Sequence, residues 1–344
     1  MTAAITTTIT TAITTATASP LLVRLHNWIG DVVVGLPALQ LLAEHGVPLQ
    51  LVGKGWASAL LAGHGWPVHT LPKGLRPRVA LWRGLHQRVP AYGAPPTPAG
   101  QRSPLDALLL ATSFSAALEA RLAGLKTMGY ATDHRRWLLH RAATPPTAPH
   151  ALQGYWQLAC QFLEVQRAPP ADIGLALTQT AQAQAAAMLA QHGVGSDYTV
   201  LCPFAVGTLA GQNKSWPGFP ALAARLAAEG LTVLLCPGPG EEAQAQQQFP
   251  QAIALNQVPL GTYAALMKTA RLVVANDTGP GHMAAAVGAP LVSVLGPTNA
   301  AQWAPWGTRV QVVQVPQGWP AVDAVAALAR AVLAQATPAQ ASAS

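Results

Sequence analysis

Two consecutive series of alternating apolar runs and helix-like segments constrain the fold of this 344-residue chain most strongly. In the first series, strand-like runs at 21–25 and 49–53 flank a helical pattern that should end at Gly46, because glycine commonly stops helices. Such alternation is typical of parallel sheets covered by helices. We therefore predict an α/β protein of two doubly wound domains, at 20–170 and 171–344. The second series has strand-like runs at 198–204, 231–238, 252–256, 272–276 and 291–296.

Composition limits the class of protein further. Apolar residues make up 51% of the chain and charged residues 10%, which fits a compact globular protein rather than a disordered one. No uninterrupted apolar stretch approaches the roughly 18 residues that a membrane-spanning helix requires. Residues 1–19 carry no charge and are rich in threonine, so we predict a disordered tail rather than a secretory signal. These features favour a cytoplasmic protein.

Positive charge is concentrated in the first half of the chain. Residues 1–150 contain 13 Lys and Arg against 5 Asp and Glu, whereas residues 151–344 contain 7 against 8. This excess predicts an anionic partner, which could be nucleic acid, a phosphorylated glycan or a membrane surface. A solvated basic face with no partner would give the same count.

Cysteine spacing gives no sign of a disulfide or a metal site. Cys160, Cys202 and Cys236 lie far apart with no CxxC pair, and the last two fall in apolar strand-like runs. We interpret those two as small buried hydrophobic side chains. The sequence shows neither a DxD pair nor a cluster of His, Cys and Asp, so an essential metal is not predicted.

Four polar loops follow apolar runs, where strands should end and helices begin. Ligands bind at that edge of a parallel sheet, and helix N-termini present free N–H groups that attract phosphate and carboxylate oxygens. In the first loop, "HNWIGD", Asp31 could cap the helix, act as a general base or bind a hydroxyl. In the second, Lys214 precedes "SWPGFPAL" and could either face a bound anion or lie at the surface.

The other two loops carry carboxylates and a histidine. "PGPGEE" contains Glu241, which could bind ribose hydroxyls or favour the start of a helix, although its glycines lack GxGxxG order. In "NDTGPGH", Asp277 and Thr278 could cap a helix beginning near Gly281, and His282 could donate a hydrogen bond to an anion. The glycines of this turn would let a phosphate approach exposed N–H groups. A phosphate cradle explains the whole loop.

Taken together, these loops resemble those of glycosyltransferase family 9, the ADP-heptose:lipopolysaccharide heptosyltransferases. The resemblance covers about residues 21–310 and rests on five segments in order: "NWIGDVVVGLPAL", "ATSFSAALEARLAGLKTMGY", "NKSWPGFPALAARL", "CPGPGEE" and "NDTGPGHMAAAVGAPLVSVLGPT". The Asn-Trp-Ile-Gly-Asp form resembles the family members that add the second heptose more than those that add the first. The resemblance implies the GT-B architecture, in which two Rossmann-like domains face a central cleft. The N-terminal domain would bind the acceptor and the C-terminal domain the nucleotide sugar.

The same resemblance implies roles for individual residues. Asp31 would be the general base that deprotonates the acceptor hydroxyl. Lys214 would bind the diphosphate and so take part in catalysis. Donor binding would also involve Thr208, Glu241, Asp277, Thr278, Gly279 and His282. Acceptor binding would involve Asn27, Arg76, Arg78 and Ser113, and the choice of acceptor would lie within 72–104.

These roles describe a metal-independent inverting displacement from ADP-heptose to an inner-core sugar of lipopolysaccharide. Lys214 and helix N-terminal amides would stabilise the leaving diphosphate, while a carboxylate on the opposite face activates the hydroxyl. We expect a monomer without cofactor, peripheral at the cytoplasmic face of the inner membrane, that does not bind nucleic acid. The alternatives are another nucleotide-sugar enzyme of this fold, such as an epimerase or a transferase with a different donor, and a non-catalytic sugar-nucleotide-binding protein. The missing glycine fingerprint disfavours an NAD-dependent oxidoreductase.

Overall fold

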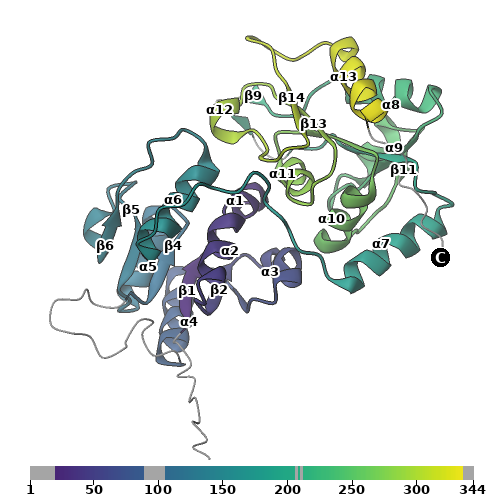
Figure 1. Cartoon of the computed structure of the whole chain (residues 1–344). Helices are drawn as coiled ribbons and strands as arrows, with labels where there is room; N and C mark the ends of the chain where they lie inside the picture. The colour runs from purple at the N-terminus through teal and green to yellow at the C-terminus, as the bar shows by residue number, and fades with distance from the viewer. Residues whose placement is uncertain (1–19, 89–104, 206–207, 210–211, 336–344) are drawn as a thin grey trace, which may run out of the picture.

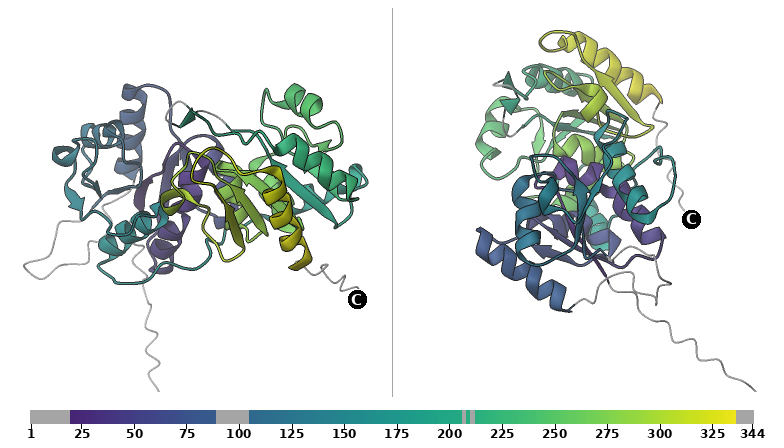
Figure 2. Two further views of the ribbon diagram at one scale, coloured as in Figure 1. Left: turned by 90° about the horizontal axis from the view of Figure 1, so that it is seen from above. Right: turned by 90° about the vertical axis from the view of Figure 1, so that its left-hand side faces the viewer.

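The computed structural model describes residues 20–88, 105–205, 208–209 and 212–335. These residues form two six-stranded sheets, and every strand pairing within each of the two is parallel. Figure 1 shows the two sheets with their helices as two halves side by side, and in the right-hand view of Figure 2 one half partly covers the other. The predicted α/β class with two doubly wound units is therefore confirmed.

The first sheet has the strand order β3-β2-β1-β4-β5-β6. Its strands are β1 (Leu21–Arg24), β2 (Leu49–Gly53), β3 (Val68–Thr70), β4 (Ala107–Leu109), β5 (Thr127–Tyr130) and β6 (Arg141–Ala143). The helices of this half are α1 (Ile29–Val34), α2 (Leu36–Glu44), α3 (Trp56–Leu61), η1 (Ala62–His64), α4 (Leu75–Arg88), α5 (Phe114–Leu122), η2 (Arg136–Leu138) and α6 (Ala151–Leu163).

The second sheet has the order β11-β10-β7-β12-β13-β14. Its strands are β7 (Tyr198–Cys202), β10 (Thr232–Leu235), β11 (Ile253–Ala254), β12 (Leu272–Asn276), β13 (Leu291–Val294) and β14 (Val310–Val313). A small antiparallel hairpin follows β7 and consists of β8 (Thr208–Leu209) and β9 (Gln212–Asn213). The helices are α7 (Gln179–Gln191), α8 (Phe219–Ala228), α9 (Glu242–Gln248), α10 (Leu260–Thr269), α11 (Gly279–Ala286), α12 (Ala300–Trp303) and α13 (Val322–Gln335).

The helical pattern that precedes Gly46 was predicted as one helix, but it forms two. Helix α1 ends at Val34 and α2 begins at Leu36, with Gly35 between them. Pro37 explains the break, because a proline inside a helix removes one backbone hydrogen bond and its ring collides with the carbonyl four residues earlier. The N–H of Gly35 still donates to Asp31 O, which closes the last turn of α1. The short helix α1 is thus a separate unit at the end of β1.

A single cluster of buried hydrophobic side chains extends through both halves. It joins Val32 and Val33 of α1 to Ala284 and Ala285 of α11. Helix α1 packs on α11 and α3 packs on α10, so the two halves meet through helices. In the described part of the chain, no helix has the length and apolar character needed to cross a membrane.

The prediction that Cys202 and Cys236 are buried is confirmed for Cys202 but not for Cys236, which is only half-buried. Cys202 lies in β7, and burial raises the pKa of its thiol to about 12. Cys160 is buried in α6, whereas Cys236, just after β10, is half-buried. Burial also raises the pKa of the Cys236 thiol. Thiols held in the neutral form are poor nucleophiles and poor metal ligands, so these side chains contribute to packing.

Candidate functional site

Three of the four polar loops lie where the strand order of a sheet reverses, and the fourth, which carries Glu241, follows the adjacent strand β10. Strands β1 and β4 are neighbours in the first sheet although they are not consecutive, and β7 and β12 have the same relation in the second. Ligands of open α/β sheets bind in the crevice at such positions, outside the carboxyl ends of the strands. Asp31 follows β1, Lys214 follows β7 and Asp277 follows β12. The topology therefore brings residues that are far apart in the sequence to the carboxyl ends of the central strands of the two sheets.

The first turns of α1 and α11 are in direct contact. A Cβ atom added to Gly30 would lie 2.8 Å from Cδ2 of His282, and one added to Gly279 would lie 2.8 Å from Cβ of Ile29. Both distances are shorter than real Cβ contacts, so only glycine fits at either position without displacing a neighbour. The loop that carries Asp31 and the loop that carries His282 are thereby joined across the two halves.

This close approach makes Gly30 a sensitive position. Because His282 is buried, its ring cannot swing away cheaply, and Gly30→Ala should lower the free energy of unfolding by about 2 kcal/mol. Gly84→Ala is a matched control, since Gly84 lies in α4 with open space around the added methyl group. Denaturant unfolding of both variants would measure the difference. Equal stability of the two variants would show that the contact between α1 and α11 tolerates a side chain.

Asp277 is the centre of a compact polar cluster. Lys214 Nζ lies 2.8 Å from Asp277 Oδ2, and the Thr298 hydroxyl donates to the same oxygen at 2.6 Å. His282 Nε2 lies 3.6 Å from Oδ1. Burial alone would raise the pKa of Asp277, but the hydrogen bonds from His282, Lys214 and Thr298 outweigh it and hold that pKa well below its usual range. The carboxylate is therefore ionised at any physiological pH.

Thr278 occupies the N-cap of α11, but the prediction that the Asp277 and Thr278 side chains cap this helix is wrong. Helix α11 begins at Gly279 rather than near Gly281, its N-cap is Thr278, and no side chain makes a capping hydrogen bond. The Asp277 carboxylate instead receives Lys214 and Thr298. The first N–H groups of α11 consequently remain available to an anion, as expected for a helix N-terminus next to a ligand.

The depressed pKa of Asp277 predicts a specific dependence of stability on pH. The stabilisation is complete above the unfolded value of about 4 and is lost as the pH falls toward the lower folded value. Asp277→Asn should therefore lower the free energy of unfolding by about 2 kcal/mol at pH 7, and this difference should shrink below pH 4. Urea unfolding at several pH values would test it. Asp323→Asn is the control, because Asp323 forms an exposed pair with Arg225 that should contribute little. A pH-independent difference between Asp277→Asn and the wild type would contradict this account.

Asp31 lies in the first turn of α1 but does not cap that helix. The N-cap is Trp28 and no side chain makes a capping hydrogen bond, which removes one of the three interpretations of Asp31. Its Oδ1 accepts a hydrogen bond from the Tyr155 hydroxyl at 3.2 Å and lies 3.7 Å from His26 Nδ1. Burial lowers the pKa of His26, so its ring is neutral near pH 7. The Asp31 side chain is 17% exposed and so remains accessible to a ligand.

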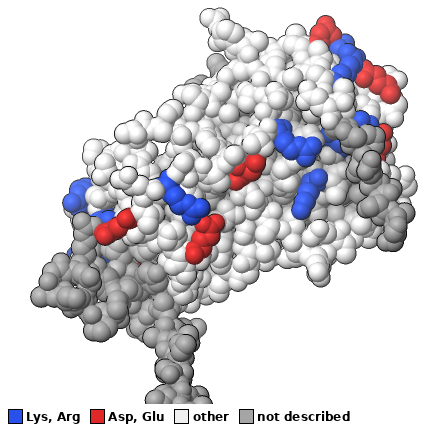
Figure 3. Space-filling model, in the orientation of Figure 1, with Lys and Arg blue, Asp and Glu red and all other residues white. Residues whose placement is uncertain are grey.

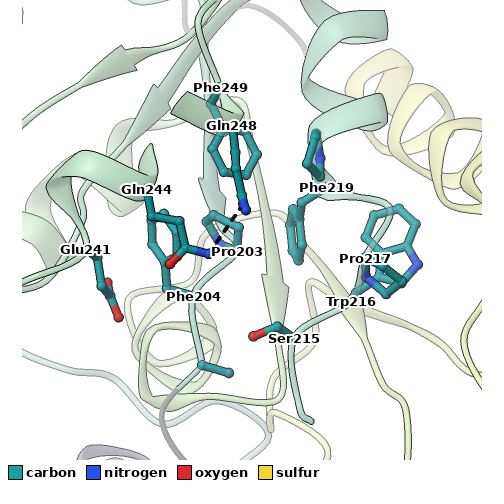
Figure 4. A pocket seen from close by; sticks show the side chains of 12 residues that line it. Pro203, Phe204, Ser215, Trp216, Pro217, Phe219, Glu241, Gln244, Gln248 and Phe249 are labelled. Atoms are coloured by element: carbon teal, nitrogen blue, oxygen red, sulfur yellow. Dashed lines mark hydrogen bonds between the residues drawn. The ribbon is translucent and has the colours of Figure 1, made fainter. Parts of the chain in front are cut away.

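Glu241 lines a cavity of about 460 Å³ in the second half (Figure 4). Its Oε2 accepts the Gly238 N–H at 2.8 Å, which orders the loop after β10. The pocket combines aromatic and proline rings with the amides of Gln244 and Gln248. Apolar walls with a few polar groups are typical of small-molecule sites. The cavity is lined by Pro203, Phe204, Ala205, Ser215, Trp216, Pro217, Phe219, Pro220, Glu241, Gln244, Gln248 and Phe249.

Asn276, at the end of β12, was not selected from the sequence. It is fully buried, and its Oδ1 accepts the Trp216 N–H at 2.9 Å while its Nδ2 donates to Pro203 O at 2.6 Å. The amide thus fixes the segment after β7, including the pocket wall, against the end of β12. A polar amide closing the apolar run "LVVAN" was the available signal.

The predicted acceptor-binding residues all lie at the carboxyl edge of the first sheet, but three of them have intramolecular partners. Asn27 Oδ1 accepts a hydrogen bond from Arg24. Arg78 donates to Pro72 O and pairs with the buried Glu119. Ser113 caps α5. Arg76 is exposed at the start of α4. The face shown in Figure 3 carries few charged side chains, with blue and red groups side by side rather than one basic patch.

Two predictions fall partly outside the described residues. Thr208 lies in β8, where the backbone is described but the side chain is not. Within the segment 72–104, the part up to residue 88 contains α4, and 89–104 lie outside the described residues.

Comparison with known proteins places this chain in a family. A family model described as glycosyltransferase family 9 (heptosyltransferase) matches residues 106–328. The chain is 33% identical over 128 residues to lipopolysaccharide heptosyltransferase 3 of Escherichia coli, covering 34% of this chain and 36% of that protein. It is 27% identical over 232 residues to lipooligosaccharide heptosyltransferase 2 of Haemophilus ducreyi, covering 62% and 66%. The chain thus matches about a third of the first relative and just under two thirds of the second.

Solved structures show the same fold. ADP-heptose lps heptosyltransferase II of E. coli superposes with a TM-score of 0.73 at 21% identity, covering 92% of this chain and 99% of that one. A family 9 glycosyl transferase from Veillonella parvula gives 0.75 at 17% identity, covering 92% and 97%. Two facing Rossmann-like domains with ligand loops at both switch points define the GT-B architecture. Because the family model matches well over half of its residues, the chain belongs to glycosyltransferase family 9.

Proposed function

We propose that this chain transfers a heptose from ADP-heptose to an inner-core sugar of lipopolysaccharide. The observation that carries the proposal is the contact of α1 with α11, which sets the Asp31 loop beside the cluster of Lys214, Asp277 and His282. A carboxylate next to a lysine and the free N–H groups of a helix N-terminus is suited to deprotonating a hydroxyl and receiving an anionic leaving group. The named heptosyltransferase relatives support this substrate class.

The donor would bind the second half of the chain. Glu241 would face the ribose from the wall of the pocket, while Lys214 and the free N–H groups of α11 would hold the diphosphate. Thr278 and Gly279 would offer backbone N–H groups to the phosphates at the start of α11. A related fold is known with both ADP and ADP-2-deoxy-2-fluoro heptose, in E. coli heptosyltransferase WaaC. We therefore infer that the donor of this chain is a sugar linked to an adenine nucleotide.

The acceptor would bind the first half. Asp31 would take the proton of the attacking hydroxyl as the bond to the diphosphate breaks on the opposite face of the sugar, which inverts the anomeric centre. Lys214 and the α11 amides would offset the charge that develops on the leaving group, so we infer that no metal is required for this step. Arg76 and its neighbours would receive an anionic acceptor.

Because all of these groups belong to one chain, we infer that the protein works as a monomer. We infer further that the protein works at the cytoplasmic face of the inner membrane as a peripheral protein. The excess of positive charge in residues 1–150 supports this placement, because such segments are attracted to anionic surfaces.

Nucleotide release with different donors tests the proposal. The protein would be incubated with ADP-heptose or a UDP-sugar, each with and without a Kdo–lipid A acceptor. We expect ADP release that depends on both ADP-heptose and the acceptor. The proposed reaction would be excluded if the protein used a UDP-sugar but not ADP-heptose. It would also be excluded if ADP-heptose were consumed at the same rate with and without the acceptor.

A further inference from the structure

Tyr155 contacts Asp31, the proposed base, from a helix that does not follow any of the four polar loops. Tyr155 lies in α6, is 7% exposed, and donates its hydroxyl hydrogen to Asp31 Oδ1 at 3.2 Å. The two residues are 124 positions apart in the chain. A buried phenol on one oxygen of a carboxylate fixes the rotation of that carboxylate, and the second oxygen remains free for another partner.

The surroundings of this hydrogen bond keep the phenol in its donor form. The His26 ring meets the Tyr155 ring edge-on, with centroids 5.3 Å apart, and Tyr130 from β5 lies nearby. Burial raises the pKa of Tyr155 well above its usual value, and the adjacent Asp31 raises it further. The tyrosine therefore acts as a hydrogen-bond donor and not as a base at neutral pH.

Helix α6 is itself held by both halves of the chain. At its N-cap, His150 accepts the Leu152 N–H through Nδ1, and its Nε2 lies 2.9 Å from Ala304 O in the second half. The Trp306 ring packs on His150 with centroids 4.9 Å apart. Tyr155 is just over one turn further along this helix. The helix that carries the Tyr155 hydroxyl thus packs on α1, α2 and β5 of its own half and is fixed at its N-cap by the second half.

We infer that Tyr155 is a positioning residue for Asp31, holding Oδ1 so that Oδ2 faces the acceptor hydroxyl. This inference rests on the proposed function, because it assumes that Asp31 is the base. A carboxylate that is free to rotate would spend less time in the reactive orientation, and orientation is a large part of the rate that an active site provides.

Tyr155→Phe is the direct test, because it removes the hydroxyl and keeps the ring. We expect kcat for heptosyl transfer to fall about 10-fold, with the affinity for ADP unchanged. The loss should appear in kcat while KM for ADP-heptose stays nearly unchanged, because the hydroxyl contacts Asp31 and not the proposed donor site. Tyr130→Phe is the matched control. Tyr130 is buried and donates to Gly154 O in the same helix, without a hydrogen bond to Asp31.

A double-mutant cycle separates this inference from the proposed function. In an Asp31→Asn background, Tyr155→Phe should cost little further activity, because the group that it positions is gone. If Asp31→Asn is inactive and Tyr155→Phe matches the wild type in kcat, the positioning role of Tyr155 is excluded, while Asp31 remains the proposed base. If Asp31→Asn stays active, the proposed base itself is excluded. A Tyr155→Phe variant that also loses ADP binding would show a structural role and overturn the inference.

Discussion

Asp31→Asn should lower kcat for sugar transfer by about 100-fold or more and leave the affinity for ADP nearly unchanged. The amide keeps the shape of the side chain and can still accept the Tyr155 hydroxyl, but it cannot take a proton from the acceptor. Steady-state rates with saturating ADP-heptose, together with calorimetric titration of ADP, would measure both quantities.

The control for this variant is Asp106→Asn in the same half. Asp106 accepts the Lys126 N–H just before β4, at the edge of the sheet opposite the proposed site. The Asp106→Asn variant should retain normal turnover. Near-normal turnover of a folded Asp31→Asn variant would exclude Asp31 as the base, whatever the control shows.

Lys214→Ala should weaken ADP binding by about 10- to 100-fold, because it removes a charged partner of the diphosphate. His282→Ala should produce a smaller loss. Both side chains approach the same carboxylate of Asp277, at 2.8 Å and 3.6 Å, so they form one cluster rather than two separate contacts. The double variant should therefore lose less than the combined losses of the single variants.

Titration of ADP against the wild type, both single variants and the double variant would measure this coupling. Lys268→Ala, at an exposed lysine near the end of α10, should bind ADP normally. Unchanged affinity in Lys214→Ala would mean that this lysine only neutralises Asp277. Strictly additive losses would mean that Lys214 and His282 act at separate places.

Most of the fold could be predicted because the central strands are continuous apolar runs. Strand β12, predicted and observed at 272–276, is fully buried between two neighbours and needs no polar residue until Asn276. Edge strands give a weaker signal: β11 falls within the predicted run 252–256, but the other edge strands of the two sheets were not predicted. Strand β14 is largely exposed, and β6 lies within 140–151, which reads as irregular because of its prolines. Their positions depend on pairing with the preceding strand of the sheet.

The candidate site could be predicted only where residue type and loop position coincide. Asp31 and Lys214 are charged residues that follow apolar strands, which is enough to select them. The orientation of Asp277 toward Lys214 instead of its own helix depends on three-dimensional placement. Tyr155 is an aromatic residue on the buried face of a helix and cannot be distinguished from a core residue without the fold.

Analysis of the acceptor after reaction tests the central claim most directly. A Kdo–lipid A acceptor would be incubated with ADP-heptose and the full chain, and the product examined by mass spectrometry and NMR. We expect the acceptor to gain one heptose whose anomeric configuration is inverted relative to the donor, and Asp31→Asn to give almost none of this product. An unmodified acceptor, or a heptose attached with retained configuration, would contradict the account.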